Sequence, residues 1–233
     1  MVYQPKLLKG NKMKWNKSAN ARLIKYLNSH NLSRGIGNEK SACSIAAMNL
    51  ALTGELTDNI PECMSAVIGK WIIRVQDAMP DKLRNSENWK SLLPLAAGTG
   101  RRREVKRLNL IKKWMWETVL PQLTPTVKNY DFFSKWENML NERSPESINI
   151  VMRASLRKGC DELAPESVRH DAHNIHNVSR YCLECYDTSK SIVQRAASSG
   201  LLVYEVSESI RKNRKNYWNK IDCCEQLNKL INI

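Results

Sequence analysis

Two glycines and three arginines lie close together in AAGTGRRR, residues 96–103. Gly98 and Gly100 allow backbone N–H groups to turn toward a ligand, and free N–H groups at a helix start bind anions. Arginine adds a planar guanidinium that grips phosphate or carboxylate through two hydrogen bonds. The spacing matches neither the P-loop nor the dinucleotide-binding glycine pattern. We expect an anion at Gly98, Gly100, Arg101, Arg102 and Arg103; the alternative is a glycine-containing connection followed by solvated arginines.

The helix expected over residues 101–120 starts with positive charge, where the helix dipole favours acids. Its outer face carries two basic ridges, one with Arg102, Lys106 and Lys113 and one with Arg103, Arg107 and Trp114. Basic residues four apart on one ridge repel each other. A bound anion would relieve both conflicts, so changing Arg101–Arg103 to alanine should preserve folding and weaken binding. The expected buried stripe is Val105, Leu108, Ile111, Met115, Trp116 and Val119.

A second basic segment, SESIRKNRKNYWNK (207–220), combines cations with aromatic side chains. Its cations are Arg211, Lys212, Arg214 and Lys215, and Tyr217 and Trp218 follow them. This combination suits single-stranded nucleic acid, because cations bind the backbone and aromatic rings stack on bases. The alternative is a solvated helix face.

The run HDAHNIHNVSRYCLEC (170–185) holds residue types that bind zinc. His170, His173 and His176 point away from Cys182 and Cys185 on a straight helix, and the first and last lie about 22 Å apart along its axis. We therefore expect no metal site unless the helix breaks or a partner chain takes part. The cysteine pair lies within a helical pattern, whereas redox pairs are typical of a helix start beside a strand.

No residue set indicates catalysis. The acids Glu39, Asp58, Glu62 and Asp77 lie near expected helix ends or exposed faces, and His30 is the one histidine outside 170–176. Nothing assembles into a catalytic triad or a metal-hydrolase pattern. We expect a protein that is not an enzyme and binds no cofactor; an unrecognised active site is the alternative.

The net charge of +14 is concentrated in two stretches. Residues 1–40 contain nine basic residues and one acid, and residues 81–120 contain ten basic residues and four acids. Such patches attract nucleic acid, nucleotides or an acidic protein surface, although a basic surface without a ligand is the alternative. No apolar run typical of a signal peptide or a transmembrane helix is found, so we expect a cytoplasmic protein with reduced cysteines.

Hydrophobic periodicity predicts an all-α multi-helix bundle of about eight or nine helices. The segment SACSIAAMNLALTG (41–54) is typical of a buried helix that ends at Gly54. The next helix should start near Asp58 and Pro61 and end before Pro80. Further expected boundaries are Ser18 and Ser86 as helix caps, Pro94 as a kink or end, and Gly200 as a helix end. LLVYEV (201–206) is the single candidate strand.

The expected domain organisation has three parts. Residues 1–17 are predicted to be a flexible basic tail, 18–123 an N-terminal helical domain, and 124–233 a C-terminal helical region. The proposed boundary coincides with the connector around Pro121 and Pro125. A single domain is the alternative.

Three segments between residues 38 and 123 carry a resemblance to known sequences. They are NEKSACSIAAMNLALTGELTDNIPECMSAVIGKWIIRVQDAMP, LRNSENWKSLLPLAAGTGR and WMWETVLPQL. These segments resemble a family of uncharacterised bacterial and bacteriophage proteins. In that family the remainder is often an alanine-rich helical tail, from which residues 145–233 depart. The resemblance implies a phage or mobile-element origin but no activity and no site residues.

Together these features suggest a non-catalytic helical binding protein. The resemblance adds the hypothesis of a phage-encoded inhibitor of a host defence system that targets nucleic acid. It would act on an effector surface or its nucleic acid through the basic segments 101–113 and 211–220. The alternatives are a direct nucleic-acid or nucleotide binder and an enzyme with an unrecognised site.

Overall fold

The chain is all-α, as its periodicity predicts. The computed structural model describes residues 14–210 and 214–233. Within them the only strands are β1 (Gly37–Asn38) and β2 (Ser41–Ala42), which form an antiparallel hairpin. Short helices make the total larger than expected. The helices are α1 (Lys17–Ser29), α2 (Ser44–Thr53), α3 (Ala66–Ala78), α4 (Asp81–Arg84), α5 (Glu87–Ala97), α6 (Glu104–Trp114), α7 (Thr124–Val127), α8 (Phe133–Glu142), α9 (Pro145–Gly159), α10 (Glu166–Glu184), α11 (Ile192–Ser209), α12 (Arg214–Ile221) and α13 (Cys223–Ile231), with a π-helical turn η1 (Met115–Val119) and a 3₁₀ turn η2 (Leu120–Leu123) after α6.

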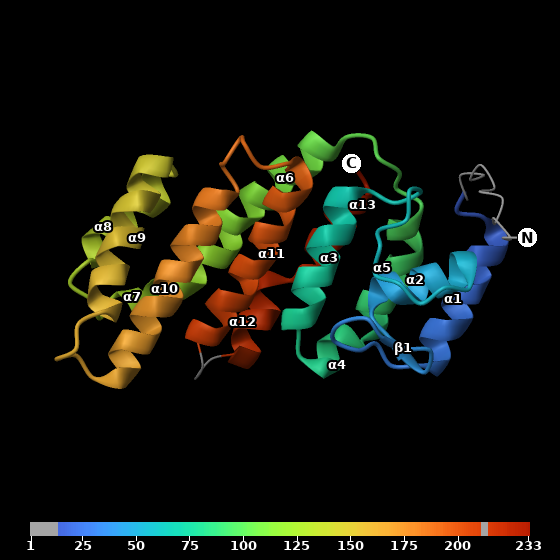
Figure 1. Ribbon diagram of the computed structural model, residues 1–233, viewed down its shortest axis with the longest axis horizontal. Coiled ribbons are helices and arrows are strands. Elements are labelled where there is room, and N and C mark those ends of the chain that lie inside the picture. Colours follow the sequence, from blue (N-terminus) through green and yellow to red (C-terminus); the bar gives the residue numbers. More distant parts are fainter. Residues whose placement is uncertain (1–13, 211–213) are drawn as a thin grey trace, which may run out of the picture.

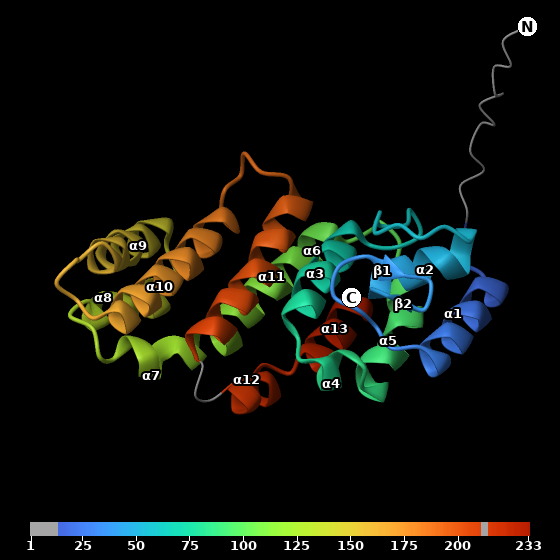
Figure 2. The ribbon, with the colours of Figure 1, turned by 60° about the horizontal axis from the view of Figure 1, so that its bottom comes forward.

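The helices form an elongated array (Figures 1 and 2). Helices α9, α10, α11 and α3 lie side by side in that order, with α8 at one end and α1 at the other. Helix α13 returns to pack against α3, α5 and α6. One continuous buried cluster extends from Leu23 to Leu230. Contacts of α11 with α3 and of α13 with α3, α5 and α6 therefore join segments from the two predicted parts. The predicted tail lies mostly outside the described residues, although Trp15 packs against the core.

Two predicted helix ends in the first half are confirmed. The hydrophobic segment forms α2, and Gly54 ends it in the left-handed conformation, with φ +81°. Glycine suits this position because a Cβ atom would clash with the backbone. Ser86 caps α5, since its hydroxyl accepts a hydrogen bond from the Trp89 N–H at 3.2 Å.

The helix predicted from Asp58 begins only at Ala66. Ser65 is its cap, and its hydroxyl accepts a hydrogen bond from the Ile68 N–H at 3.1 Å. The residues before it form a loop, because the buried side chain of Asn49 donates to the backbone carbonyls of residues 57 and 59 at 2.6 and 2.8 Å. A helix there would need those carbonyls for its own N–H groups.

Three further boundaries differ from the prediction. Asn16, rather than Ser18, caps α1 by accepting from the backbone N–H of residue 19 at 2.9 Å. Pro94 does not end α5, which continues to Ala97, so of the two predicted outcomes only the helix end is wrong. Gly200 lies in the middle of α11, and the candidate strand 201–206 is helical there. Asn16 is a preferred N-cap in its own right, and Gly200 lies where α11 packs against Arg74 of α3.

Three tryptophans meet in the core where α3, α5 and α6 converge. The ring of Trp71 lies 6.5 Å from that of Trp89 and 5.7 Å from that of Trp114, measured between centroids.

Helix α11 approaches α3 closely. A Cβ atom on Gly200 would lie 2.6 Å from the Cβ of Arg74, so the approach requires glycine at this position.

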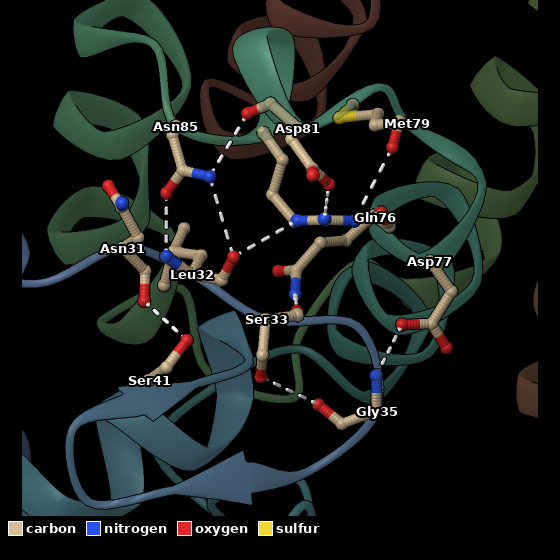
Figure 3. Close-up of polar contacts among 11 residues, drawn as sticks. Asn31, Leu32, Ser33, Gly35, Ser41, Gln76, Asp77, Met79, Asp81 and Asn85 are labelled. Carbon is tan, nitrogen blue, oxygen red and sulfur yellow. Dashed lines mark hydrogen bonds and ion pairs between the residues drawn. The ribbon is translucent and has the colours of Figure 1, made fainter.

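A buried arginine attaches the segment before the β hairpin to the end of α3 (Figure 3). Arg84 is 3% exposed, and its guanidinium donates to the carbonyls of Leu32 and Gln76, both at 3.1 Å, and pairs with Asp81. The Gln76 amide donates to the Ser33 carbonyl at 2.8 Å. Sequence periodicity gave no indication of this cluster, because it does not show that the distant Leu32 carbonyl reaches the Arg84 guanidinium.

Gly200→Ala tests the close approach of α11 to α3. The added methyl must displace Arg74 or separate the two helices, and we expect a loss of about 1–2 kcal/mol in the free energy of unfolding. Gly159→Ala in α9 is the matched control, because its Cβ would meet atoms only at 3.5 Å. Alanine should be neutral or stabilising there. Urea unfolding measures the free energy of unfolding of both variants. Equal values for the two variants would contradict the close approach of α11 to α3.

Candidate binding surface on α6

The start of α6 differs from the predicted one. The helix begins at Glu104, and Arg101 and Arg102 precede its N-cap, Arg103, which has a φ of +64°. The first turn therefore contains an acid, as the helix dipole favours. The conflict expected between the arginines and the dipole is smaller than predicted, because the arginines precede the first turn and Glu104 lies in it.

The glycine N–H groups before α6 are bonded within the protein. Gly100 donates to the Cys63 carbonyl at 2.8 Å, and Gly98 donates to the Ala96 carbonyl. The free glycine amides that the anion hypothesis assumed are therefore already used. Gly100 itself has a φ of +63°, which glycine adopts readily.

Arg107 is buried, whereas the helical wheel places it on an outer ridge. It is 3% exposed, and its guanidinium donates to four carbonyls. The acceptors are Leu230 at 3.1 Å, Arg102 at 2.6 Å, Gly100 at 3.3 Å and Thr99 at 3.4 Å. One side chain thus joins the 99–102 loop and the C-terminal helix α13 to α6. A helical-wheel projection does not include hydrogen-bond acceptors from other segments, so it could not show that Arg107 would be buried.

Glu104 connects the same cluster to the start of α3. Its Oε1 accepts a hydrogen bond from the Ala66 N–H at 2.7 Å, and its Oε2 accepts one from the Ser65 hydroxyl at 2.5 Å. The Arg107 Nη1 lies 4.0 Å from the same Oε2. Burial lowers the pKa of Arg107, and the neighbouring Glu104 carboxylate opposes that shift. The buried cation therefore has the charged and polar partners that a buried charge requires.

Two of the three arginines before α6 also bind backbone oxygens. Arg101 donates to the carbonyls of Ile60 at 3.2 Å and Pro61 at 3.3 Å, and Arg103 donates to the backbone oxygen of Ile233. The expectation that all three could become alanine without loss of stability no longer follows, because two of them hold other segments in place.

The buried face of α6 is turned from the predicted stripe toward the ridge that carries Arg107 and Trp114. Trp114 is buried, and its Nε1 donates to the Ile221 carbonyl at 2.9 Å. Val105 is instead 64% exposed. The remaining members of the predicted stripe are buried: Leu108, Ile111, Met115, Trp116 and Val119. The buried positions of Arg107 and Trp114 account for the turn.

The residues left exposed form what we call the α6 surface: Arg102, Val105, Lys106, Asn109 and Lys113. Arg102 and Lys106 make no ion pair with any described residue, and the remaining parts of the chain contain no Asp or Glu. Lys113 lies 4.0 Å from Glu117, a carboxylate that also lies 3.8 Å from Arg143. The surface thus carries positive charge that this chain does not neutralise.

The second basic segment has its aromatic residues inside. Arg211 and Lys212 lie outside the described residues, and Arg214 and Lys215 begin α12. Tyr217 and Trp218 are 2% and 5% exposed, and the Tyr217 hydroxyl donates to a backbone carbonyl of α11 at 3.0 Å. Neither ring is available to stack on a base.

The histidines and cysteines of residues 170–185 do not converge. The Nδ1 of His176 lies 3.1 Å from the Met152 carbonyl, and that of His170 lies 3.1 Å from the Asn174 amide nitrogen. Cys182 and Cys185 are fully buried, and burial raises the pKa of Cys185 to about 12. No group of three His, Cys, Asp or Glu side chains is placed to bind a metal ion in the described parts of the chain.

Two surface cavities on other helices lie away from α6. A cleft of about 820 Å³ between α1 and α5 is lined by Ile24, Lys90 and Leu95, among others. A shallower one of about 490 Å³ lies between α9 and α10, beside Met152 and His176. Neither contains a residue of 98–113. The α6 surface therefore suits an extended partner better than a nucleotide, which binds in a concave pocket.

Arg107→Met tests whether the buried guanidinium holds the loop and α13 to α6. Methionine fills similar space but leaves the four carbonyls without their donor and Glu104 without its neighbouring cation, so we expect a loss of about 2–4 kcal/mol in the free energy of unfolding. Lys106→Met, on the exposed neighbour, should change it by less than about 0.5 kcal/mol. Chemical denaturation compares the two, and a small effect at Arg107 would contradict its structural role.

No protein-family model, curated protein or solved structure matches this chain. No helix among the described residues is both long and apolar enough to cross a membrane. What the α6 surface binds must be inferred from its own residues.

Proposed function

We propose that this chain is a non-catalytic binding protein that recognises an anionic partner through the α6 surface. The observation that carries the proposal is the pair Arg102 and Lys106, both exposed and without an ion pair to any acidic residue that the structure describes. Unneutralised cations of this kind attract an anionic partner from a distance and favour its binding.

The other charged side chains near α6 have roles within the fold. Arg107 and Glu104 bond to loop carbonyls and to the start of α3, and Arg101 and Arg103 bond to backbone oxygens. The hydrogen-bonding groups of these side chains are therefore already used within the protein. This division separates the binding residues from the structural ones and supports recognition rather than catalysis.

An acidic protein surface is the partner class that we favour over nucleic acid. Tyr217 and Trp218, which were expected to stack on bases, are buried, and so is Trp114 on the predicted basic ridge. Without exposed rings, the described basic segments lack the feature that supports binding of single strands. The resemblance of residues 38–123 to phage proteins extends the proposal to an effector of a host defence system in the host cytoplasm. That extension rests on the resemblance alone.

A charge-reversal experiment tests the proposal. Arg102→Glu/Lys106→Glu should reduce affinity for poly-L-glutamate by at least about tenfold at roughly 50 mM salt, because attraction becomes repulsion. Lys25→Glu/Lys128→Glu is the matched control, since Lys25 on α1 and Lys128 after α7 are both exposed and the net charge changes equally. Its affinity should stay within about threefold of the wild type.

The measurement is fluorescence anisotropy of labelled poly-L-glutamate, with a labelled DNA duplex as a second probe. Equal losses in the two double variants would mean that net charge alone attracts the probe, and the proposal would fail. It would also fail if the wild type bound neither probe. Tighter binding of DNA than of poly-L-glutamate, with a steep loss at higher salt, would favour the nucleic-acid alternative.

A further inference from the structure

Two exposed aliphatic side chains line a common cleft at one end of the helical array (Figure 1). The cleft of about 820 Å³ lies between α1 and α5, and Ile24 and Leu95 in its lining are 42% and 57% exposed. The buried side chains of Leu27 and Pro94 also line it. Exposed apolar residues usually occur singly on protein surfaces, whereas these four residues from two helices offer one shared apolar surface.

The cleft is formed before any partner binds. Lys90 of α5 holds the end of α1, because its Nζ donates to the carbonyls of Leu27 and His30, both at 2.8 Å. At the other end Trp15, just before α1, lies beside Gly98, which follows α5: a Cβ atom on Gly98 would lie 3.5 Å from the Trp15 ring. The two helices therefore run antiparallel, and both ends of the cleft are fixed. A preformed surface loses little conformational entropy on binding.

The two ends of the cleft carry opposite charges. Glu87, in the first turn of α5, lines the end beside the last turn of α1. Lys17 begins α1, two turns before Ile24 on the same helix face, at the end where α5 finishes. Both charged side chains are exposed, and neither forms an ion pair with a described residue. The ammonium of Lys90 is already bonded to the α1 carbonyls, so Glu87 and Lys17 are the charges available to a partner.

We propose that this cleft is the contact surface of a twofold dimer, with a second copy of this chain as its occupant. A twofold axis through the middle of the cleft places Ile24 and Leu95 of one copy against the same pair of the other. It also places the Glu87 end of each copy beside the Lys17 end of the other, which forms two ion pairs. The surface is complementary to itself in apolar character and in charge, and this favours a second copy over an unrelated protein.

The dimer is independent of the proposed function. No residue that lines the cleft belongs to the α6 surface, so that surface stays free in both copies.

The extent of the surface sets the expected affinity. Helix α1 has 13 residues and is about 20 Å long, and two adjacent helices are roughly 20 Å wide, so each copy offers a footprint of about 400 Å². The net charge of +14 on each copy adds repulsion, which physiological salt screens. Interfaces smaller than the standard of about 800 Å² per partner are weak, so we expect a dissociation constant on the order of 10–100 μM.

Substitutions of the apolar pair test the contact. Leu95→Ser and Ile24→Ser should each raise the dissociation constant of the dimer by at least about tenfold, because each removes apolar contact twice. Ile150→Ser is the matched control, since Ile150 is 49% exposed on α9 and does not line the cleft. Its dissociation constant should stay within about twofold of the wild type. Sedimentation equilibrium of the full chain, from roughly 10 to 500 μM at about 150 mM salt, measures these values. Thermal unfolding confirms that each variant is folded.

A charge exchange tests the orientation of the two copies. Glu87→Lys and Lys17→Glu each bring like charges together and should each raise the dissociation constant by about fivefold. The double variant Lys17→Glu/Glu87→Lys restores both ion pairs and the net charge, so its dissociation constant should lie within about twofold of the wild type. Net charge alone predicts a different pattern, because Lys17→Glu lowers the positive charge of each copy and would then strengthen the dimer.

Weakening by both serine variants, together with recovery in the double charge variant, supports the dimer, and three results would overturn it. A chain that stays monomeric at every concentration means that something other than a second copy covers the cleft. A dimer that Leu95→Ser and Ile24→Ser leave unchanged uses another face. A double charge variant that dimerises no better than the single charge variants contradicts the twofold arrangement.

Discussion

The hydrogen bonds of the buried Arg107 guanidinium are the constraint on which the arrangement around α6 depends. A guanidinium inside a protein is costly unless acceptors surround it, and moving it there alone would cost several kcal/mol. Here the acceptors come from the loop before α6 and from the C-terminal helix α13, more than a hundred residues later. If the loop or α13 separated from α6, the Arg107 guanidinium would lose its hydrogen-bond acceptors or become exposed to solvent. Glu104 extends the constraint to the start of α3, so three distant segments share one polar cluster.

That cluster also determines which of the neighbouring cations remain available. Five arginines and lysines follow Gly100 within seven residues, and the sequence alone treats them as one basic patch. In the fold Arg107 is internal, and Arg101 and Arg103 bind backbone oxygens at the edges of other segments. Arg102 and Lys106 are left without an acid. The net charge of +14 is therefore a poor guide to binding, because only part of it lies on a surface where nothing offsets it.

The sequence predicted the fold class and several local features, for identifiable reasons. Helical periodicity and Gly54 located α2, since both are properties of neighbouring residues. The start of α3 was missed because the Asn49 side chain bonds loop carbonyls that a helix would otherwise use. The predicted orientation of α6 was wrong because the hydrogen-bond acceptors of Arg107 lie in other segments, which no local sequence pattern reveals. Val105 shows the same limit, since a valine beside buried positions is assigned to the core until the neighbouring helices are placed.

Chemical labelling tests the division of these cations most directly. Phenylglyoxal modifies exposed guanidinium groups, and mass spectrometry of peptides separates the rates at Arg102 and Arg107 in the native protein. The account predicts rapid modification of Arg102 and protection of Arg107 until the protein unfolds, with intermediate rates at Arg101 and Arg103. Modification of Arg107 at the rate of Arg102 under native conditions would contradict the buried cluster and the surface that it supports.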